Sequence, residues 1–259
     1  MTVSAQRIAG GVDVHDEIAR MSLSAHGVNG RAVPVDDVLE MVASTACRLL
    51  PPVDHVSISL VRHHRSGRVL REKTVATGGP SRLFANTQWE DGAGPGIEAI
   101  LSGAVVTVED VDDERRWPQL MDVVRRDTPI RSSLCVAMTA ADRDIGIIVM
   151  HSEHPHAFDA DSIEVAQMLG VHAAIAASAA RREEQFVQAL ASRDVIGQAK
   201  GMIMERFGVD ADRAFSMLAT LSQETNTPVA QVSRKLVGAV SPTVSRPGAV
   251  AAADDEGAQ

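Results

Sequence analysis

The chain lacks tyrosine altogether and has only two tryptophans among its 259 residues. This scarcity argues against a nucleotide-binding cage built from large aromatic rings. Cysteine is equally scarce, because Cys47 and Cys135 are the only two and lie far apart in apolar stretches without a nearby histidine. Since the thiolate is the reactive form of cysteine, we expect both to be buried, inert thiols without a redox role.

Long hydrophobic runs are also missing. No apolar run approaches the roughly 20 residues that cross a bilayer, and the N-terminus has no basic region followed by an apolar stretch. We therefore expect a cytoplasmic protein without a membrane segment. No Ser-His-Asp order, no paired carboxylates and no zinc-ligand spacing stands out, so no catalytic residues, no metal and no certain cofactor are predicted.

Two local clusters could still suggest a ligand. His151, His154 and His156 lie beside Pro155 without a cysteine, which favours a loop after a strand over a metal site. The segment 92–96, Gly-Ala-Gly-Pro-Gly, precedes a helix, whose N-terminus attracts anions, but it lacks the Gly-Lys-Ser/Thr ending of a phosphate loop. Phosphate binding is therefore disfavoured there.

The net charge of −9 is unevenly distributed along the chain. Residues 1–180 carry 16 basic and 24 acidic side chains, a net charge of −8, whereas residues 181–240 carry 8 and 7, a net charge of +1. An acidic body repels nucleic acid, so any nucleic-acid contact is expected within residues 181–240.

The pattern of apolar residues predicts an α+β domain at 34–178, after a loose lead-in at 1–33 with one amphipathic turn from Val14 to Leu23. A helix is predicted from Val35 to Leu49, where Pro51 and Pro52 stop it. The expected strands are Val56–Leu60, Val69–Ala76, Val105–Val108, Ser132–Thr139 and Ile145–Met150. The last two should form an antiparallel hairpin, and turn-rich pieces separate the others, at Thr77–Pro80, Asp91–Gly96 and Asp110–Pro118.

A long helix should follow, with Asp161 as its N-cap and Glu164 as the reciprocal partner. Its part at 161–195 is predicted to be a connecting coiled coil, with small apolar residues at spacings of three and four. This stripe comprises Ile163, Ala166, Leu169, Ala173, Ala176, Ala180, Val187, Leu190 and Val195. A rod of roughly 70 Å, from about 1.5 Å per residue, cannot bury itself against one domain, so we expect it to pair with a second copy.

The segment 193–238 is predicted to be a three-helix bundle, in which Ile196, Ala199 and Ile203 of the first helix face the core. Gly208 should end that helix and Asp210 should cap the second. The second helix should bury Ala211, Ala214, Phe215, Leu218 and Leu221, and the third, opening at Thr227-Pro228, should bury Val229, Val232, Leu236 and Val237. Residues 241–259 are predicted to be a disordered tail.

Arg193, Gly197, Lys200 and Met204 form a stripe beside the core face of the first bundle helix, with Gly201 next to it. Glycine inside a helix costs about 1 kcal/mol relative to alanine, so the two glycines require either a closely packed helix or a ligand backbone. Ser222 and Asn226, at the end of the second helix, either cap the turn or offer polar contacts.

The bundle resembles an ANTAR domain, the RNA-binding module of transcription antitermination regulators. The resemblance rests on Ile196-Gly197-Gln198-Ala199-Lys200-Gly201, Met204-Glu205-Arg206, Ala214-Phe215, Leu218, Ser222, Asn226 and Val232. The preceding domain resembles a GAF sensory domain through Gly94-Pro95-Gly96-Ile97-Glu98-Ala99, Arg116-Trp117-Pro118, Ile130-Arg131-Ser132-Ser133-Leu134 and Ala157-Phe158-Asp159. The GAF-then-ANTAR order is common in actinobacterial regulators.

The resemblance implies a homodimer that binds paired RNA hairpin loops and so prevents terminator formation. It implies RNA contacts by Arg193, Lys200, Gly201, Ser222 and Asn226, with Ala199 permitting close approach. The GAF-like domain would sense an unknown small molecule or control dimerisation. Many GAF domains in this setting have cysteine where this chain has Gly96, so thiol sensing at that position is lost.

Three alternatives remain at the level of sequence. A DNA-binding transcription factor would use the third helix, Pro228 to Val237, but Arg234 and Lys235 lie near its end, whereas recognition helices contact bases from their beginning. A structural dimeric sensor without RNA binding is compatible with a net charge of only +1. A methionine sulfoxide reductase would need reactive thiols at Cys47 and Cys135, which no motif supports.

Overall fold

The computed structural model describes residues 14–25, 33–65, 67–140 and 143–240. The predicted tail at 241–259 and most of the lead-in at 1–33 lie outside the described residues. The chain divides into two compact units between Gln185 and Phe186, called unit 1 and unit 2 below. The boundary falls within one long helix, α6 (Ala160–Phe207).

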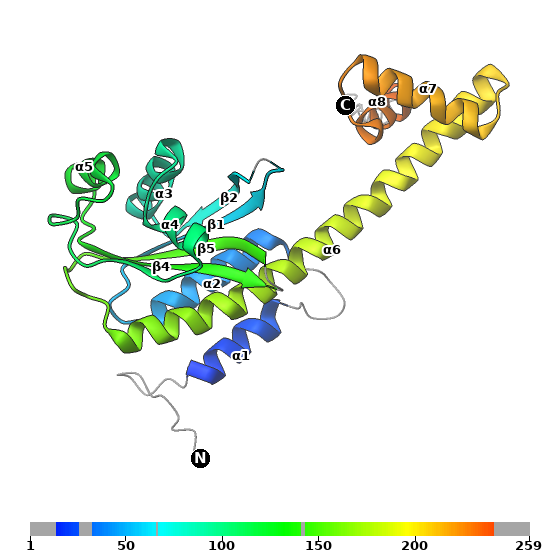
Figure 1. Cartoon of the computed structure of the whole chain (residues 1–259). Coiled ribbons are helices and arrows are strands. Elements are labelled where there is room, and N and C mark those ends of the chain that lie inside the picture. The colour runs from blue at the N-terminus through cyan, green and yellow to red at the C-terminus, as the bar shows by residue number, and fades with distance from the viewer. Residues whose placement is uncertain (1–13, 26–32, 66, 141–142, 241–259) are drawn as a thin grey trace, which may run out of the picture. The chain divides into compact units, whose positions relative to one another are not determined.

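Unit 1 is built on a five-stranded antiparallel sheet of order β2-β1-β5-β4-β3 (Figure 1). The strands are β1 (His55–His63), β2 (Val69–Ala76), β3 (Val106–Val108), β4 (Ser132–Ala140) and β5 (Arg143–Ser152). All five predicted strands and the β4–β5 hairpin are confirmed, with Ser132 opposite Ser152. Between β5 and β1, a Cβ on Gly146 would lie 2.6 Å from the Ser59 carbonyl oxygen, so only glycine allows the strands to pair this closely.

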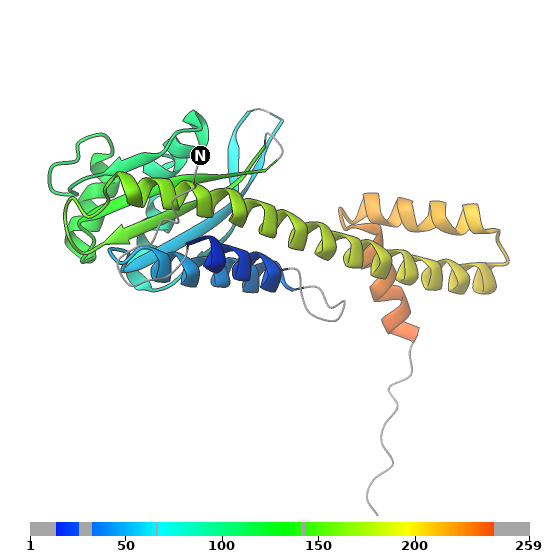
Figure 2. The same cartoon turned by 90° about the horizontal axis from the view of Figure 1, so that it is seen from below.

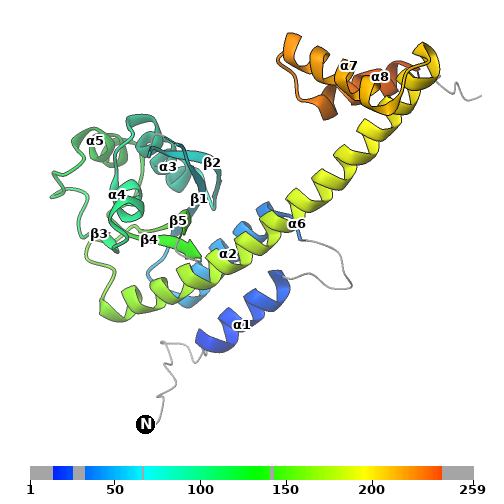
Figure 3. The same ribbon diagram turned by 45° about the vertical axis from the view of Figure 1, so that its right-hand side comes forward.

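One face of the sheet is covered by α2 (Val35–Leu49) and the first part of α6, and α1 (Val14–Ala25) packs on the outside of α2 (Figure 3). The bounds predicted for α2 are confirmed. The amphipathic segment predicted from Val14 to Leu23 is confirmed as part of α1, but its place in a loose lead-in is wrong, because Val14, Ile18 and Met21 are at most 3% exposed and belong to the core of unit 1. The i, i+4, i+7 spacing of these three residues forms a stripe that packs on α2.

Two polar contacts hold α6 against unit 1 near Gln185. Pro34 precedes α2 and offers no side-chain cap, and Glu184 Oε1 instead accepts a hydrogen bond from the Val35 N–H at 2.7 Å. Arg181 forms an ion pair with Glu72 of β2. An unpaired N–H at the start of a helix is costly when it is buried, so these contacts fix the rotation of α6 about its axis at this point.

The other face of the sheet carries α3 (Gly79–Asp91), α4 (Pro95–Ser102) and α5 (Pro118–Asp127). The sequence predicts a helix after Gly96 but not α3 or α5. Thr77–Pro80, expected to be a turn, opens α3 because Pro80 fits the first helical turn. The core beneath these helices includes Phe84, Leu120 and Met121, each no more than 1% exposed.

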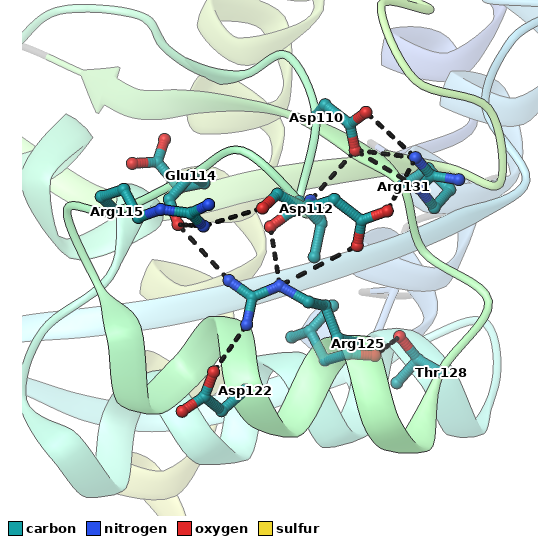
Figure 4. Close-up of polar contacts among 10 residues, drawn as sticks. Asp110, Asp112, Glu114, Arg115, Asp122, Arg125, Thr128 and Arg131 are labelled. Carbon is teal, nitrogen blue, oxygen red and sulfur yellow. Dashed lines mark hydrogen bonds and ion pairs between the residues drawn. The ribbon is translucent and has the colours of Figure 1, made fainter.

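The loop between β3 and α5, predicted to be turn-rich, is fastened by arginines (Figure 4). Arg131 donates to both carboxylate oxygens of Asp110 at 3.0 Å, and Arg125 of α5 donates to the Val111 carbonyl at 3.1 Å. Burial opposes ionisation of Asp110, but the Asp112 N–H and Arg131 together lower the pKa of its carboxyl. The carboxylates of this acidic loop therefore stabilise its conformation.

The start of α6 corrects one prediction and its packing corrects another. Asp159, not Asp161, is the cap, because its Oδ1 accepts from the Ser162 N–H at 2.8 Å and from the Ser162 hydroxyl at 2.7 Å. The apolar stripe expected to pair with a second copy is largely buried in unit 1's own core. Its buried members are Ala166, Leu169, Ala173, Ala176 and Ala180.

Among the described helices, α6 is the one that is long and apolar enough to cross a membrane by length and composition. Half of its most apolar window is buried inside the protein. This burial is typical of a core helix that packs on a sheet.

Unit 2 contains the end of α6 with α7 (Ala211–Glu224) and α8 (Val229–Val240). Within it, α7 runs beside the end of α6 and α8 crosses them (Figure 2). The predicted stop and cap are confirmed, since Gly208 has φ +62° and Asp210 Oδ1 accepts from the Arg213 N–H at 2.8 Å. The core comprises Ala199, Ile203, Ala214, Leu218 and Val232.

Candidate nucleic-acid interface

A groove of about 770 Å³ lies within unit 2, between the α6 segment around Gly197 and the side chain of Phe215 on α7. Arg193 and Lys200 line it together with Gly197, so three of the four members of the predicted stripe meet in one place, whereas Met204 packs against the core of unit 2. Ile196 adds apolar surface and Asp194 adds the one carboxylate. The groove therefore combines an apolar wall with two cations.

Neither cation is committed to another group in the described part of the chain. Arg193 is exposed and Lys200 is half-buried, and no hydrogen bond or ion pair among the described residues uses either head group. Arg131 and Arg125 of unit 1, by contrast, are tied to carboxylates. An unpaired cation beside a groove can neutralise a phosphate without breaking an existing contact.

The two helix-interior glycines have open space around them. A Cβ built on Gly197 or on Gly201 would meet nothing within 4 Å. Close packing of another helix, one of the two explanations for these glycines, is therefore not provided by the described residues. The remaining explanation is a group from outside the chain that approaches the backbone.

Three of the other predicted contact residues have a structural role in this bundle. Ala199 is fully buried in the core of unit 2. Ser222 donates its hydroxyl to the Thr227 carbonyl at 2.6 Å, which braces the turn between α7 and α8. Asn226 has φ +46°, a left-handed conformation that asparagine tolerates better than most residues. None of the three lines the groove, and neither does Gly201.

Phe215 is the residue that the sequence placed wrongly. It was expected in the core of α7 with Leu221, yet the two are 45% and 46% exposed. Ala214 and Leu218, one turn apart, are the residues of α7 that are buried against Ala199 and Ile203 of α6. The sequence does contain a signal for this exposure, because Phe215 lies at the edge of the apolar stripe of its helix.

The polar groups buried in unit 1 offer less chemistry. His151 lies inside β5, not in the predicted loop, and its Nδ1 is 2.8 Å from the Ser133 hydroxyl. Burial, with a smaller contribution from His55, lowers the pKa of His151 to about 3. The described residues contain no group of three or more metal-binding side chains.

The two thiols also lack the features of a reactive site. Burial raises the pKa of both Cys47 and Cys135, so the thiolate is disfavoured at neutral pH. Cys135 is completely buried, as predicted, whereas Cys47 is only partly buried.

Position 96 is closed by its neighbours. A Cβ on Gly96 would lie 2.7 Å from Ile147 Cδ1 and 2.9 Å from Gln88 Oε1. The Gly96 N–H already donates to Gln88 Oε1 at 3.2 Å, so one N–H at the start of α4 is not free for an anion.

Comparison with protein families assigns both units. The family model of the GAF domain matches residues 32–178, more than half of the chain, and that of the ANTAR domain matches residues 184–237. The chain is a GAF and ANTAR domain protein. ANTAR domains belong to RNA-binding antitermination regulators and GAF domains are sensory modules, so this GAF–ANTAR protein is a regulator with a sensory domain.

Solved structures similar to the GAF–ANTAR protein include GAF domains and a reductase, all of low identity. The GAF domain of a Coxiella burnetii phosphoenolpyruvate-protein phosphotransferase is 14% identical over 68% of this chain and 99% of that one, with a TM-score of 0.49. Free methionine-R-sulfoxide reductase from Neisseria meningitidis is 17% identical over 70% and 98%, with a TM-score of 0.48. No curated protein matches this chain. We infer no activity from these similarities.

Proposed function

We propose that the GAF–ANTAR protein is a dimeric, RNA-binding transcription antitermination regulator that acts in the cytoplasm, and that its GAF domain senses a small molecule or controls dimerisation. RNA would be bound by the groove of unit 2, with Arg193 and Lys200 on phosphates. Paired hairpin loops, one for each bundle of the dimer, would be the target. No catalytic step is proposed, because both thiols are stabilised in the protonated form.

The observation that carries this proposal is the meeting of two uncommitted cations with an open glycine backbone. Gly197 presents no side chain, and nothing in the described chain lies within 4 Å of where its Cβ would be. A phosphate backbone can thus approach α6 between Arg193 and Lys200. With a net charge of +1 over residues 181–240, binding must rely on a few well-placed contacts.

Dimerisation is supported by apolar side chains of α6 that remain exposed after its inner stripe is buried. Val171 and Ile175 are 52% and 50% exposed, and Phe186 and Leu190 are 59% and 46% exposed. Val171 and Ile175 in unit 1 lie one turn apart on α6, and so do Phe186 and Leu190 in unit 2. A second copy of α6 packed against these residues would bury their side chains.

Control of the dimer by the GAF domain would act through α6. Glu184 and Arg181 bind α6 to α2 and β2, so a change in the packing of unit 1's helices would be passed to this helix. Such coupling requires two arrangements of the helix that a signal biases.

RNA binding is tested with the full chain and an RNA selected from a pool of paired hairpins with randomised loops. We expect Lys200→Gln to weaken binding about tenfold and to reduce the slope of log K against log salt by about 0.7, as loss of one single-strand phosphate contact does. Fluorescence anisotropy at several salt concentrations measures both.

The matched controls are Lys235→Gln on α8 and Arg206→Gln in the last turn of α6, both exposed and outside the groove. Unchanged binding by Lys200→Gln and Arg193→Gln would refute the assignment of this face. Selection that recovers no RNA, or equal binding to duplex DNA, would refute the proposed function itself.

A further inference from the structure

Phe215 is an exposed aromatic ring in a protein with few of them. The chain has five phenylalanines and two tryptophans. Phe84, Phe158 and Trp117 are buried, at 9% exposure or less. Phe215 is 45% exposed on α7, where it lines the groove with Arg193 and Lys200. A solvent-exposed aromatic ring and two unpaired cations in one groove are suited to binding a planar, negatively charged ligand.

The walls of the groove favour a nucleobase over an aliphatic group. The ring of Phe215 lines the groove from α7, and the side-chain-free backbone at Gly197 and the apolar Ile196 line it from α6. Its volume of about 770 Å³ falls within the roughly 300–1,000 Å³ of pockets that hold small organic molecules. The two cations match the phosphates on either side of a base, and Asp194 would repel an anionic group placed next to it.

We propose that Phe215 is a stacking platform for one unpaired base of the bound RNA loop, with Arg193 and Lys200 holding the phosphates that flank it. This inference rests on the proposed RNA binding and adds the residue that receives the base. Unstacked loop bases are the usual targets of sequence-specific RNA readers, and aromatic side chains are their usual platforms. The platform is sequence-tolerant, because every base has a π-face.

The test compares Phe215→Leu and Phe215→Trp with Phe207→Leu in the full chain, on the selected paired-hairpin RNA. Phe207 is 59% exposed at the end of α6 and does not line the groove, so it undergoes the same chemical change elsewhere in unit 2. We expect Phe215→Leu to bind about tenfold more weakly with an unchanged salt slope, because stacking is lost and phosphate contacts are kept. Phe215→Trp and Phe207→Leu should bind within threefold of the wild type.

A second readout follows the base. With 2-aminopurine at each loop position in turn, one position should be quenched on binding to the wild type and to Phe215→Trp, and not on binding to Phe215→Leu. A third variant, Gly197→Leu, adds a side chain to the groove from α6. It should fold normally, since nothing lies within 4 Å of the new Cβ, and should lose about tenfold in affinity, whereas Gly238→Leu on α8, which also meets nothing within 4 Å, should not.

The outcomes separate the two proposals. If Phe215→Leu binds as tightly as the wild type while Lys200→Gln is weakened, the stacking platform is wrong and RNA binding by this face stands. Should Phe215→Leu instead change the self-association of the chain and leave RNA affinity intact, the ring belongs to a protein contact and the platform is again refuted. Failure to select any RNA removes the proposed function and the platform with it.

Discussion

At the scale of single residues, the polar groups of this protein divide into those with a partner in the fold and those without one. Asp110, Glu184 and Ser222 each complete a local structure, and their chemistry is used there. Arg193 and Lys200 complete nothing among the described residues. Residues that bind a ligand are more readily found in the second group, because an unpaired charged side chain can contact a ligand without breaking a contact of the fold.

His151 shows what burial does to a titratable group. Its pKa of about 3 in the folded protein lies below the unfolded value of 6.5, so the unfolded chain binds more protons between these values and stability rises with pH there. We expect unfolding of the GAF unit to become easier by roughly 2 kcal/mol as the pH falls from 7 to 5. Denaturant titrations at the two pH values measure this difference.

In His151→Gln the dependence on pH over this interval should largely disappear, whatever the stability of the variant at pH 7. His154→Gln, at an exposed position, is the control and should keep the wild-type dependence. A wild-type protein with equal stability at pH 7 and pH 5 would show that His151 is not buried in the neutral form.

At the scale of elements, α6 carries two different faces along one helix. Its inner stripe of small residues, such as Ala173 and Ala176, lies close against the sheet, and Gly170 continues this contact next to Val136. Its outer face keeps larger residues, including Val171 and Ile175, in solvent. Small residues allow the close approach to the sheet, and large ones on the outside offer area to a partner.

The start of α6 provides a stability prediction for a single element. Asp159→Ala should destabilise the GAF unit by about 1 kcal/mol, the usual cost of losing an N-cap, because the Ser162 N–H and hydroxyl lose their acceptor. Asp161→Ala, within the first turn, should cost only the loss of a favourable charge near the helix N-terminus, about 0.3 kcal/mol at this exposed position. Urea unfolding of the two variants distinguishes them, and equal losses would contradict the assignment of Asp159 as the cap.

At the scale of the whole molecule, the two units have different kinds of surface and therefore different tasks. Unit 1 has a strongly acidic sequence and ties several of its arginines to carboxylates, which suits a sensor and disfavours nucleic acid. Unit 2 has a small core, and none of the cations among its described residues forms an ion pair. A regulator of this design needs two copies if its target presents two hairpin loops.

We expect Val171→Glu with Ile175→Glu to shift the protein from dimer to monomer, because two charges would enter an apolar contact. Light scattering coupled to size-exclusion chromatography gives the mass, and the monomer should also bind paired-hairpin RNA more weakly than the wild type. Leu101→Glu on α4, where the leucine is 68% exposed, is the matched control. A double variant that remains dimeric would place the contact elsewhere.

Much of the fold was predictable because its signals are local. Strict alternation marked β1, and the Pro51-Pro52 pair marked the end of α2. The missed helices, α3 and α5, have Pro80 and Pro118 in their first turns. Their buried residues contact strands that are distant in the sequence, and the local pattern of apolar residues does not reveal such contacts. Asp159 was overlooked as the cap for a related reason, since two neighbouring aspartates give the same signal and only the backbone decides between them.

The sequence by itself determined the order of the domains, the strands and the candidate cations, since composition, alternation and motif spacing are properties of neighbouring residues. Tertiary structure alone decided which side chains are left over. It buried the alanine stripe of α6 in the chain's own core, turned Phe215 toward solvent, and gave Ser222 and Asn226 to a turn. The reason is that burial and hydrogen bonding depend on contacts between residues that are distant in the sequence. A side chain is available to a binding partner only when no such contact buries or pairs it.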